Sequence, residues 1–173
     1  MTHATIATHL WLQEGAEEAA QFYTALFEGA RITDTLRWRE GWDTPDDEAV
    51  PGAVLTVTVE LAGQRIVLMN GGPAVRLNEG ASIMVVVDDQ AEVNRLWAAL
   101  TADGGREGPC GWCADRWGVS WQIVPAALDR ALADSDSAAA AQAFQAMIGM
   151  GRLDGKAIEA AARGDASTQA EAA

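Results

Sequence analysis

The sequence of 173 residues predicts an α+β fold of paired βαβββ modules followed by a C-terminal helical extension. Two observations support this. Apolar residues recur with period two in some segments and with helical period in others. The resulting order, strand, helix, strands, occurs twice at a spacing of about 75 residues. Each repeat has too little core to fold alone, so we expect the two halves to pack against each other.

The first repeat covers residues 5–73. Its expected elements are a strand over 5–13, a helix over 14–27, and strands over 31–39, 53–61 and 65–70. Between the strands over 31–39 and 53–61 lies an acidic stretch, Asp43–Glu48. We interpret it as part of a solvated surface loop, with a mobile lid as the alternative.

The second repeat covers residues 80–125 and completes a predicted domain over 1–125. Its expected elements are a strand over 81–87, a helix over 90–100 and a hairpin with strands over 112–115 and 119–124. Residues 126–163 are expected to form a helical extension of the same domain. Its expected buried residues are Leu128, Leu132, Phe144, Met147, Ile148, Leu153 and Ile158. The small, polar tail over 164–173 is expected to be disordered.

Composition excludes several classes of partner. Lys and Arg number 12 against 25 Asp and Glu, which gives a net charge of −13. Phosphate contacts need clustered basic groups, so we expect neither a nucleic-acid partner nor docking on an anionic membrane. No apolar run approaches the ~20 residues of a membrane span, and the N-terminus lacks a signal-like segment. A cytoplasmic protein is therefore expected.

Several motifs in sequence order resemble one protein family. They are Leu10-Trp11-Leu12 before Glu17-Glu18-Ala19, Asn70-Gly71-Gly72-Pro73, Asp89–Val93 with Trp97, Cys110-Gly111-Trp112 and Asp115–Pro125. Together with the helical tail, they make residues 5–162 similar to the PhnB-like branch of the vicinal-oxygen-chelate superfamily, which includes glyoxalase and bleomycin-resistance proteins. This branch is often labelled 3-demethylubiquinone-9 3-methyltransferase-like, but a fold does not fix a function.

The resemblance implies a glyoxalase/bleomycin-resistance-like fold, a homodimer and a small-molecule cavity. Metal-dependent members place four ligands on the first and fourth strands of each half. The matching positions here are Thr8 or His9, Leu68, Ser82 and Gln122. His9 and Gln122 are weak metal candidates, and two neutral groups hold a divalent ion poorly. We therefore expect no metal and no cofactor.

The alternation of side chains along strands predicts which residues would line that cavity. The predicted lining consists of Thr8, Leu10, Leu68, Asn70, Ser82, Met84, Ser120 and Gln122. Gln122 and Asn70 would orient the ligand, whereas Trp121 and Ile123 would face the helices. Trp42, Trp112 and Trp117 lie in or near predicted loops and are candidates for the cavity rim.

Cys110 and Cys113 form a CxxC pair that precedes a hairpin, not a helix, so a thioredoxin-like site is disfavoured. A buried Cys110 with an incidental Cys113 is the expected arrangement. The favoured function is the binding or sequestration of a small organic molecule. The alternatives are a metal-dependent lyase, isomerase or dioxygenase-like enzyme with a degenerate site, and a methyltransferase. Against a methyltransferase, the sequence lacks the glycine-rich turn expected of a site for S-adenosylmethionine.

Overall fold

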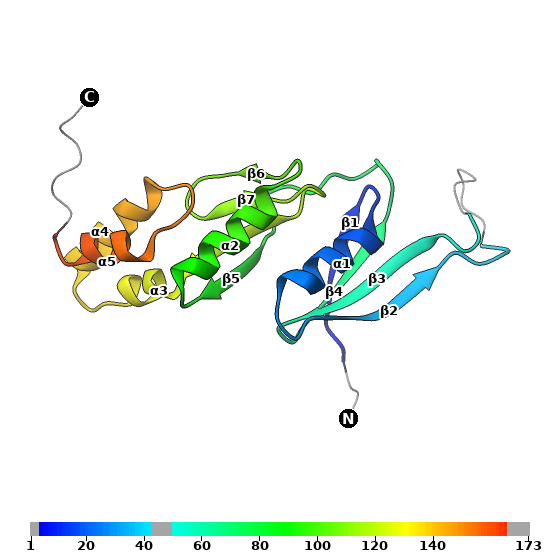
Figure 1. Cartoon of the computed structure of the whole chain (residues 1–173), viewed down its shortest axis with the longest axis horizontal. Coiled ribbons are helices and arrows are strands. Elements are labelled where there is room, and N and C mark those ends of the chain that lie inside the picture. The colour runs from blue at the N-terminus through cyan, green and yellow to red at the C-terminus, as the bar shows by residue number, and fades with distance from the viewer. Residues whose placement is uncertain (1–3, 43–49, 166–173) are drawn as a thin grey trace. The chain divides into compact units, whose positions relative to one another are not determined.

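The computed structural model describes residues 4–42 and 50–165, and the chain divides into two compact units, 1–78 and 79–173 (Figure 1). Each unit contains a four-stranded sheet and the order strand, helix, three strands. The predicted α+β fold of paired βαβββ modules is confirmed. The acidic stretch Asp43–Glu48 and the tail residues 166–173 lie outside the described residues.

The first unit holds one complete module. Its elements are β1 (Thr8–Leu12), α1 (Ala16–Leu26), β2 (Arg31–Arg37), β3 (Val54–Leu61) and β4 (Gln64–Asn70). The strand order is β1-β4-β3-β2, with β1 parallel to β4 and the other pairs antiparallel. Helix α1 packs on one face of this sheet through a fully buried ridge that includes Ala19, Ala20 and Tyr23.

The second unit repeats this arrangement. Its module consists of β5 (Ile83–Val87), α2 (Gln90–Thr101), β6 (Arg106–Glu107), β7 (Trp112–Ala114) and β8 (Ser120–Pro125). The order β5-β8-β7-β6 matches that of the first sheet, again with the first strand parallel to the last. Strand β6 could not be predicted, because two residues are too short to show a periodic pattern.

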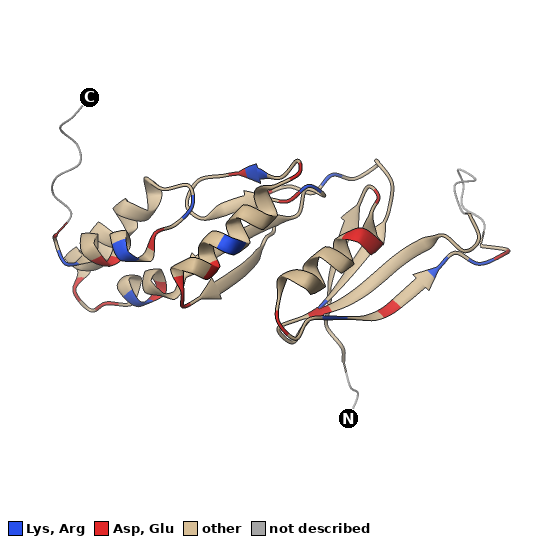
Figure 2. Cartoon of the chain, viewed as in Figure 1, with Lys and Arg blue, Asp and Glu red and all other residues tan. Residues whose placement is uncertain are grey.

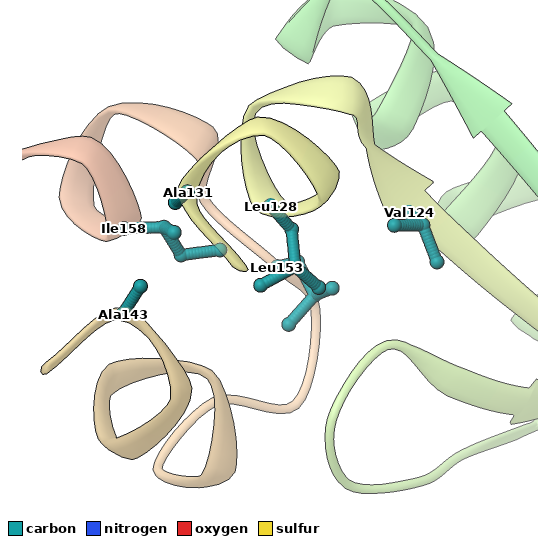
Figure 3. Close-up of a cluster of buried hydrophobic side chains, with 6 residues drawn as sticks. All are labelled: Val124, Leu128, Ala131, Ala143, Leu153 and Ile158. Carbon is teal, nitrogen blue, oxygen red and sulfur yellow. The ribbon is translucent and has the colours of Figure 1, made fainter. Parts of the chain in front are cut away.

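Three short helices complete the second unit: α3 (Ala126–Leu132), α4 (Ser137–Ile148) and α5 (Gly155–Ala162). Their buried residues form one cluster with the end of β8, as Figure 3 shows. The members of this cluster are Val124, Leu128, Ala131, Ala143, Leu153 and Ile158. None of the helices in the described part of the chain has both the length and the apolar character that crossing a membrane requires.

Three residues predicted to be buried in this extension are exposed. Leu132, Phe144 and Ile148 are 40%, 44% and 48% exposed. The helices pack through small side chains such as Ala131 and Ala143, so their axes approach closely and the larger residues remain outside. The prediction was wrong because an Ala-rich helix can bury its small face instead of its large apolar residues.

A side chain from β4 caps the N-terminus of α1. Gly15, the residue before the helix, has no side chain with which to bind the free N–H groups of the first turn. Asn70 supplies this group, because its Oδ1 accepts a hydrogen bond from the Ala16 N–H at 2.8 Å. Its Nδ2 donates to the carbonyl of Val54 at 3.0 Å. Asn70 therefore joins α1, β3 and β4.

A buried carboxylate fixes the turn between β7 and β8. Asp115 is 4% exposed and accepts hydrogen bonds from the backbone N–H groups of Trp117 and Val119, each at 3.0 Å. Its second oxygen accepts from the indole Nε1 of Trp121 at 2.9 Å. The carboxylate thus binds both the turn and the following strand.

Replacing Asn70 with alanine should destabilise the first unit. The variant loses the cap on Ala16 and leaves the Val54 carbonyl without its amide donor. We expect the free energy of unfolding to fall by about 1–2 kcal/mol, measured by urea denaturation. Gln64→Ala, which removes an exposed amide bonded to Thr8 at the other end of β4, is the control and should cost less than about 0.5 kcal/mol. Equal losses in the two variants would contradict the capping role.

Candidate functional site

A cavity of about 390 Å³ lies in the second unit, at β6, β7 and the start of β8. It is lined by Glu79, Arg106, Glu107, Gly108, Pro109, Cys110, Trp112, Cys113, Ala114 and Ser120. We call it the β6–β8 pocket. Ser120 and Trp112 belong to the residues predicted for the cavity and its rim. The other two rim candidates, Trp42 and Trp117, are not among its lining residues, and Trp117 instead lies 4.3 Å from the guanidinium of Arg116.

The strand register places two rows of side chains on the same face of this sheet. One row runs from Arg106 through Ala114 to Ser120, because these residues are paired across β6, β7 and β8. The next row runs from Trp112 through Gln122 to Met84. Residues that alternate with these, such as Trp121, are fully buried on the face that α2 covers. The pocket therefore belongs to the face opposite α2, which we call the open face.

Three of the four strands of the second sheet contribute no charged side chain to its open face, and the charge comes from Arg106 on β6. Figure 2 shows β5, β7 and β8 free of Lys, Arg, Asp and Glu, as their sequences require. Gln122 donates from Nε2 to the Ser82 hydroxyl at 2.7 Å. Ser120 is 4% exposed, and no group in the described part of the chain is hydrogen-bonded to its hydroxyl. Ser120 is thus a buried polar group with free hydrogen-bonding capacity.

The C-terminal extension holds the wall of the pocket that Cys110 forms. Cys110 and Gly111 both have positive φ angles, 55° and 80°. Their N–H groups donate to the carbonyls of Met150 and Gly151, each at 2.7 Å. Leu153, fully buried, lies so close to Gly111 that a Cβ there would be 2.8 Å from its Cδ1. Glycine is therefore required at 111 by both conformation and space.

A glutamine at the start of α2 fixes the extension from the other side. Gln90 donates from Nε2 to the carbonyl of Leu153 at 2.9 Å and accepts at Oε1 from the N–H of Gly155, also at 2.9 Å. Both ends of one amide are used, so the loop before α5 has a defined position. The Cys110-Gly111-Trp112 motif is visible in the sequence, but its contact with residues about 40 positions further along the chain is not.

The two cysteines are arranged opposite to expectation. Cys113 is buried and Cys110 is half-buried, and both are free thiols. Burial raises the pKa of the Cys113 thiol to about 12, and the carboxylates of Asp115 and Glu107 add to this rise. The Cys110 thiol donates to the carbonyl of Ile148 at 3.8 Å. The prediction failed because Cys113 pairs with Trp121 on the α2 side of the sheet.

In the first module, the side-chain alternation differs from our expectation. Thr8, Leu10, Leu68 and Asn70 lie on the face that α1 covers. Leu68 is fully buried there, and Asn70 is occupied as the cap of α1. These four residues therefore do not share the open face of their sheet. The sequence does not show which residues of β4 face α1, because β4 has apolar residues on both of its faces.

The side chains that alternate with these along β1 and β4 form the open face of the first module, opposite α1. It presents His9 and Trp11 from β1, beside Val67 and Met69 from β4. The indole of Trp11 covers Gly71, where any side chain would overlap it, and donates to the carbonyl of Gly72 at 3.0 Å. This contact requires glycine at position 71 of the Asn-Gly-Gly-Pro motif, and the positive φ of 75° at Gly72 favours glycine there.

The donors present do not fit the divalent metal of the wider superfamily. On the first module's open face, His9 is accompanied by apolar side chains from β4. In the second module, the amide of Gln122 is hydrogen-bonded to Ser82. Within the described residues, no three His, Cys, Asp or Glu side chains gather into a group that could hold a metal ion. We therefore assign no chemical step to a metal.

Comparison with known proteins identifies the family. The family model described as 3-demethylubiquinone-9 3-methyltransferase matches residues 4–124. The chain belongs to this family. It is a PhnB-like member of the vicinal-oxygen-chelate superfamily, which confirms the resemblance found in the sequence. The family match ends before the extension, so it does not test the predicted similarity of the helical tail.

Solved structures support the same fold. The PhnB protein from Bacillus cereus is 25% identical, with a TM-score of 0.59, and the match covers 70% of this chain and 99% of that one. PA1353 from Pseudomonas aeruginosa is 20% identical, with a TM-score of 0.58, and the match covers 71% of this chain and 98% of that one. No curated protein sequence matches the chain.

Shortening Leu153 to alanine should loosen the wall that the extension supports. Loss of this buried side chain should lower the free energy of unfolding by about 2–5 kcal/mol. It should also speed the reaction of the Cys110 thiol with Ellman's reagent, because the bonds to Met150 and Ile148 would open more often. Leu132→Ala, at an exposed position of α3, is the control and should leave the labelling rate unchanged. An unchanged rate in Leu153→Ala would contradict the assigned role.

The raised pKa of Cys113 predicts selective alkylation. At pH 9 the folded protein should react with iodoacetamide at Cys110 only, because Cys113 is buried and remains protonated up to about pH 12. Mass spectrometry should show one adduct in the native state and two in denaturant. The unfolded thiol ionises near its ordinary value of 9.0, so this residue's contribution to stability should decline between pH 9 and 12. A native adduct in the Cys110→Ser variant would refute the assignment.

Proposed function

We propose that this protein binds a small organic molecule without a resident metal ion. The observation that carries the proposal is the β6–β8 pocket, whose volume of about 390 Å³ lies within the usual range for ligand sites. Its walls are largely apolar, and among them lies the buried hydroxyl of Ser120, to which the described residues supply no hydrogen-bonding partner. Apolar walls with a few polar groups are typical of small-molecule sites.

The proposal follows the chemistry of the side chains, not the family label. A methyltransferase would need a site for S-adenosylmethionine, and the chain has no glycine-rich turn between a first strand and a helix to provide one. A metal-dependent enzyme would need three or four strong ligands, whereas no three His, Cys, Asp or Glu side chains gather together in the described part of the chain. Binding is the function that these residues support best.

The assembly and location are part of the proposal. We propose a homodimer in the cytoplasm, based on the family resemblance and on the composition of the chain. Light scattering after size exclusion should then give twice the mass of one chain.

A thermal-shift screen combined with elemental analysis tests the binding function. Protein purified without chelator or metal-affinity resin should contain no stoichiometric divalent metal. Some uncharged organic compounds in a broad panel should raise the melting temperature, since a ligand at 100 times its Kd stabilises by about 2.7 kcal/mol. S-adenosylmethionine should give no shift.

Two results would contradict this function. One metal ion per subunit, lost in a His9→Ala variant, would indicate the metal-dependent alternative. A concentration-dependent shift with S-adenosylmethionine would indicate methyl transfer instead.

A further inference from the structure

We propose that the β6–β8 pocket takes an uncharged, planar aromatic molecule with one hydrogen-bonding group, which meets the hydroxyl of Ser120 while the ring packs on Trp112. This inference rests on the proposed function and specifies its ligand class. Four features of the pocket lead to it: a free buried hydroxyl, an aromatic wall, the spacing between them, and the placement of charge.

The Ser120 hydroxyl requires a polar partner. It is 4% exposed, and the described residues supply no hydrogen bond to it. A buried hydroxyl without a partner costs about 1–3 kcal/mol, so native structures seldom leave one unpaired unless water or a ligand satisfies it. A ligand with one donor or acceptor at this point would recover that cost. A purely apolar ligand would not.

Trp112 supplies a flat wall beside this hydroxyl. It is two residues from Ala114 in β7, so both side chains project from the same face. The methyl of Ala114 is small, which leaves space over the position directly beside Ser120. Indole rings pack favourably with other aromatic rings in offset or edge-to-face arrangements. The wall therefore favours a planar ring over a bulky aliphatic group.

The spacing sets the size of the molecule. Trp112 pairs with Gln122, and Ser120 lies two residues before Gln122 on β8. Trp112 and Ser120 are thus diagonal neighbours, which lie about 7–8 Å apart in antiparallel sheets. One or two fused rings cover this distance, and such a molecule fits within about 390 Å³.

The charges of the pocket favour an uncharged ligand. Its charged lining residues are exposed and of mixed sign: Glu79, Arg106 and Glu107. Glu107 also accepts a hydrogen bond from the indole of Trp97 at 2.9 Å. The buried lining residues, Cys113, Ala114 and Ser120, carry no charge. An ion placed next to them would lose its hydration, and the exposed charges of both signs favour neither an anion nor a cation.

Three matched probes separate these features. 2-Naphthol has both the ring and the hydroxyl, naphthalene has the ring alone, and decahydro-2-naphthol has the hydroxyl on a saturated, non-planar frame. Calorimetric titration of the full chain should show the tightest binding for 2-naphthol. Each of the other two should bind about tenfold more weakly, the loss expected for one hydrogen bond or one aromatic contact.

A variant without the hydroxyl tests the position of the ligand. Ser120→Ala breaks no side-chain hydrogen bond among the residues that the structure describes, so we expect it to fold normally. It should reduce the affinity for 2-naphthol about tenfold and leave that for naphthalene unchanged. Ser82→Ala removes a hydroxyl from the same face but outside the lining and should leave both affinities unchanged.

Two further measurements test where the ligand binds. Bound 2-naphthol should slow the labelling of Cys110. Trp112→Leu should weaken the binding of 2-naphthol, whereas Trp117→Leu, outside the lining, should not.

Equal affinity of 2-naphthol and decahydro-2-naphthol would overturn the aromatic class. Unchanged 2-naphthol affinity in Ser120→Ala would overturn the assigned hydrogen bond. Failure of all three probes would overturn the inference as a whole. The proposed function would survive any of these results if another compound from the thermal-shift panel binds, so the two failures are distinguishable.

Discussion

The buried carboxylate of Asp115 is the constraint on which the second module depends. By accepting from Trp117, Val119 and the indole of Trp121, it fixes both the tight turn and the strand that follows. The turn sets the pairing of β7 with β8, and that pairing decides which residues share a face. A shift of one residue would exchange the two faces of β8 and bring Trp121 to the open side. The pocket with its free hydroxyl is therefore a consequence of how one carboxylate is satisfied.

A second constraint comes from the extension. Its helices bury an apolar cluster against the end of β8 (Figure 3). The loop between α4 and α5 also supplies two backbone carbonyls to the wall of the pocket. Positive φ angles at two successive residues, one of them not glycine, carry a conformational cost. The two short hydrogen bonds to Met150 and Gly151 offset it. The wall is thus held by residues that do not line the pocket themselves.

The sequence predicted the order of elements well, because long segments with clear periods report their own secondary structure. It also predicted that Trp121 and Gln122 lie on opposite sides of β8, and in the structure Trp121 is fully buried while Gln122 bonds to Ser82. In β4, apolar residues occupy both faces, so the phase depends on where α1 lies, and Leu68 was assigned to the wrong side.

Other features depend on contacts between distant residues, and sequence patterns do not contain them. Asn70 looked like a ligand-binding amide, but its partner is a helix N-terminus more than 50 residues earlier in the chain. The pairing of Cys113 with Trp121 decides which of the two cysteines is buried. The part of the pocket that could be predicted, Ser120 and Trp112, lies on regular strands. The part of the pocket that could not be predicted consists of irregular backbone.

The residues that line the pocket and the residues that hold its wall in place lie in different parts of the chain, and this affects how the family can diverge. The family match ends at residue 124, whereas the carbonyls that hold Cys110 and Gly111 come from residues 150 and 151. A relative that ends near the last strand must satisfy the same two N–H groups with water or with other acceptors. Its wall would then adopt another conformation even if every lining residue were identical. Gain or loss of a tail can thus change the shape of this pocket in evolution while its lining residues remain the same.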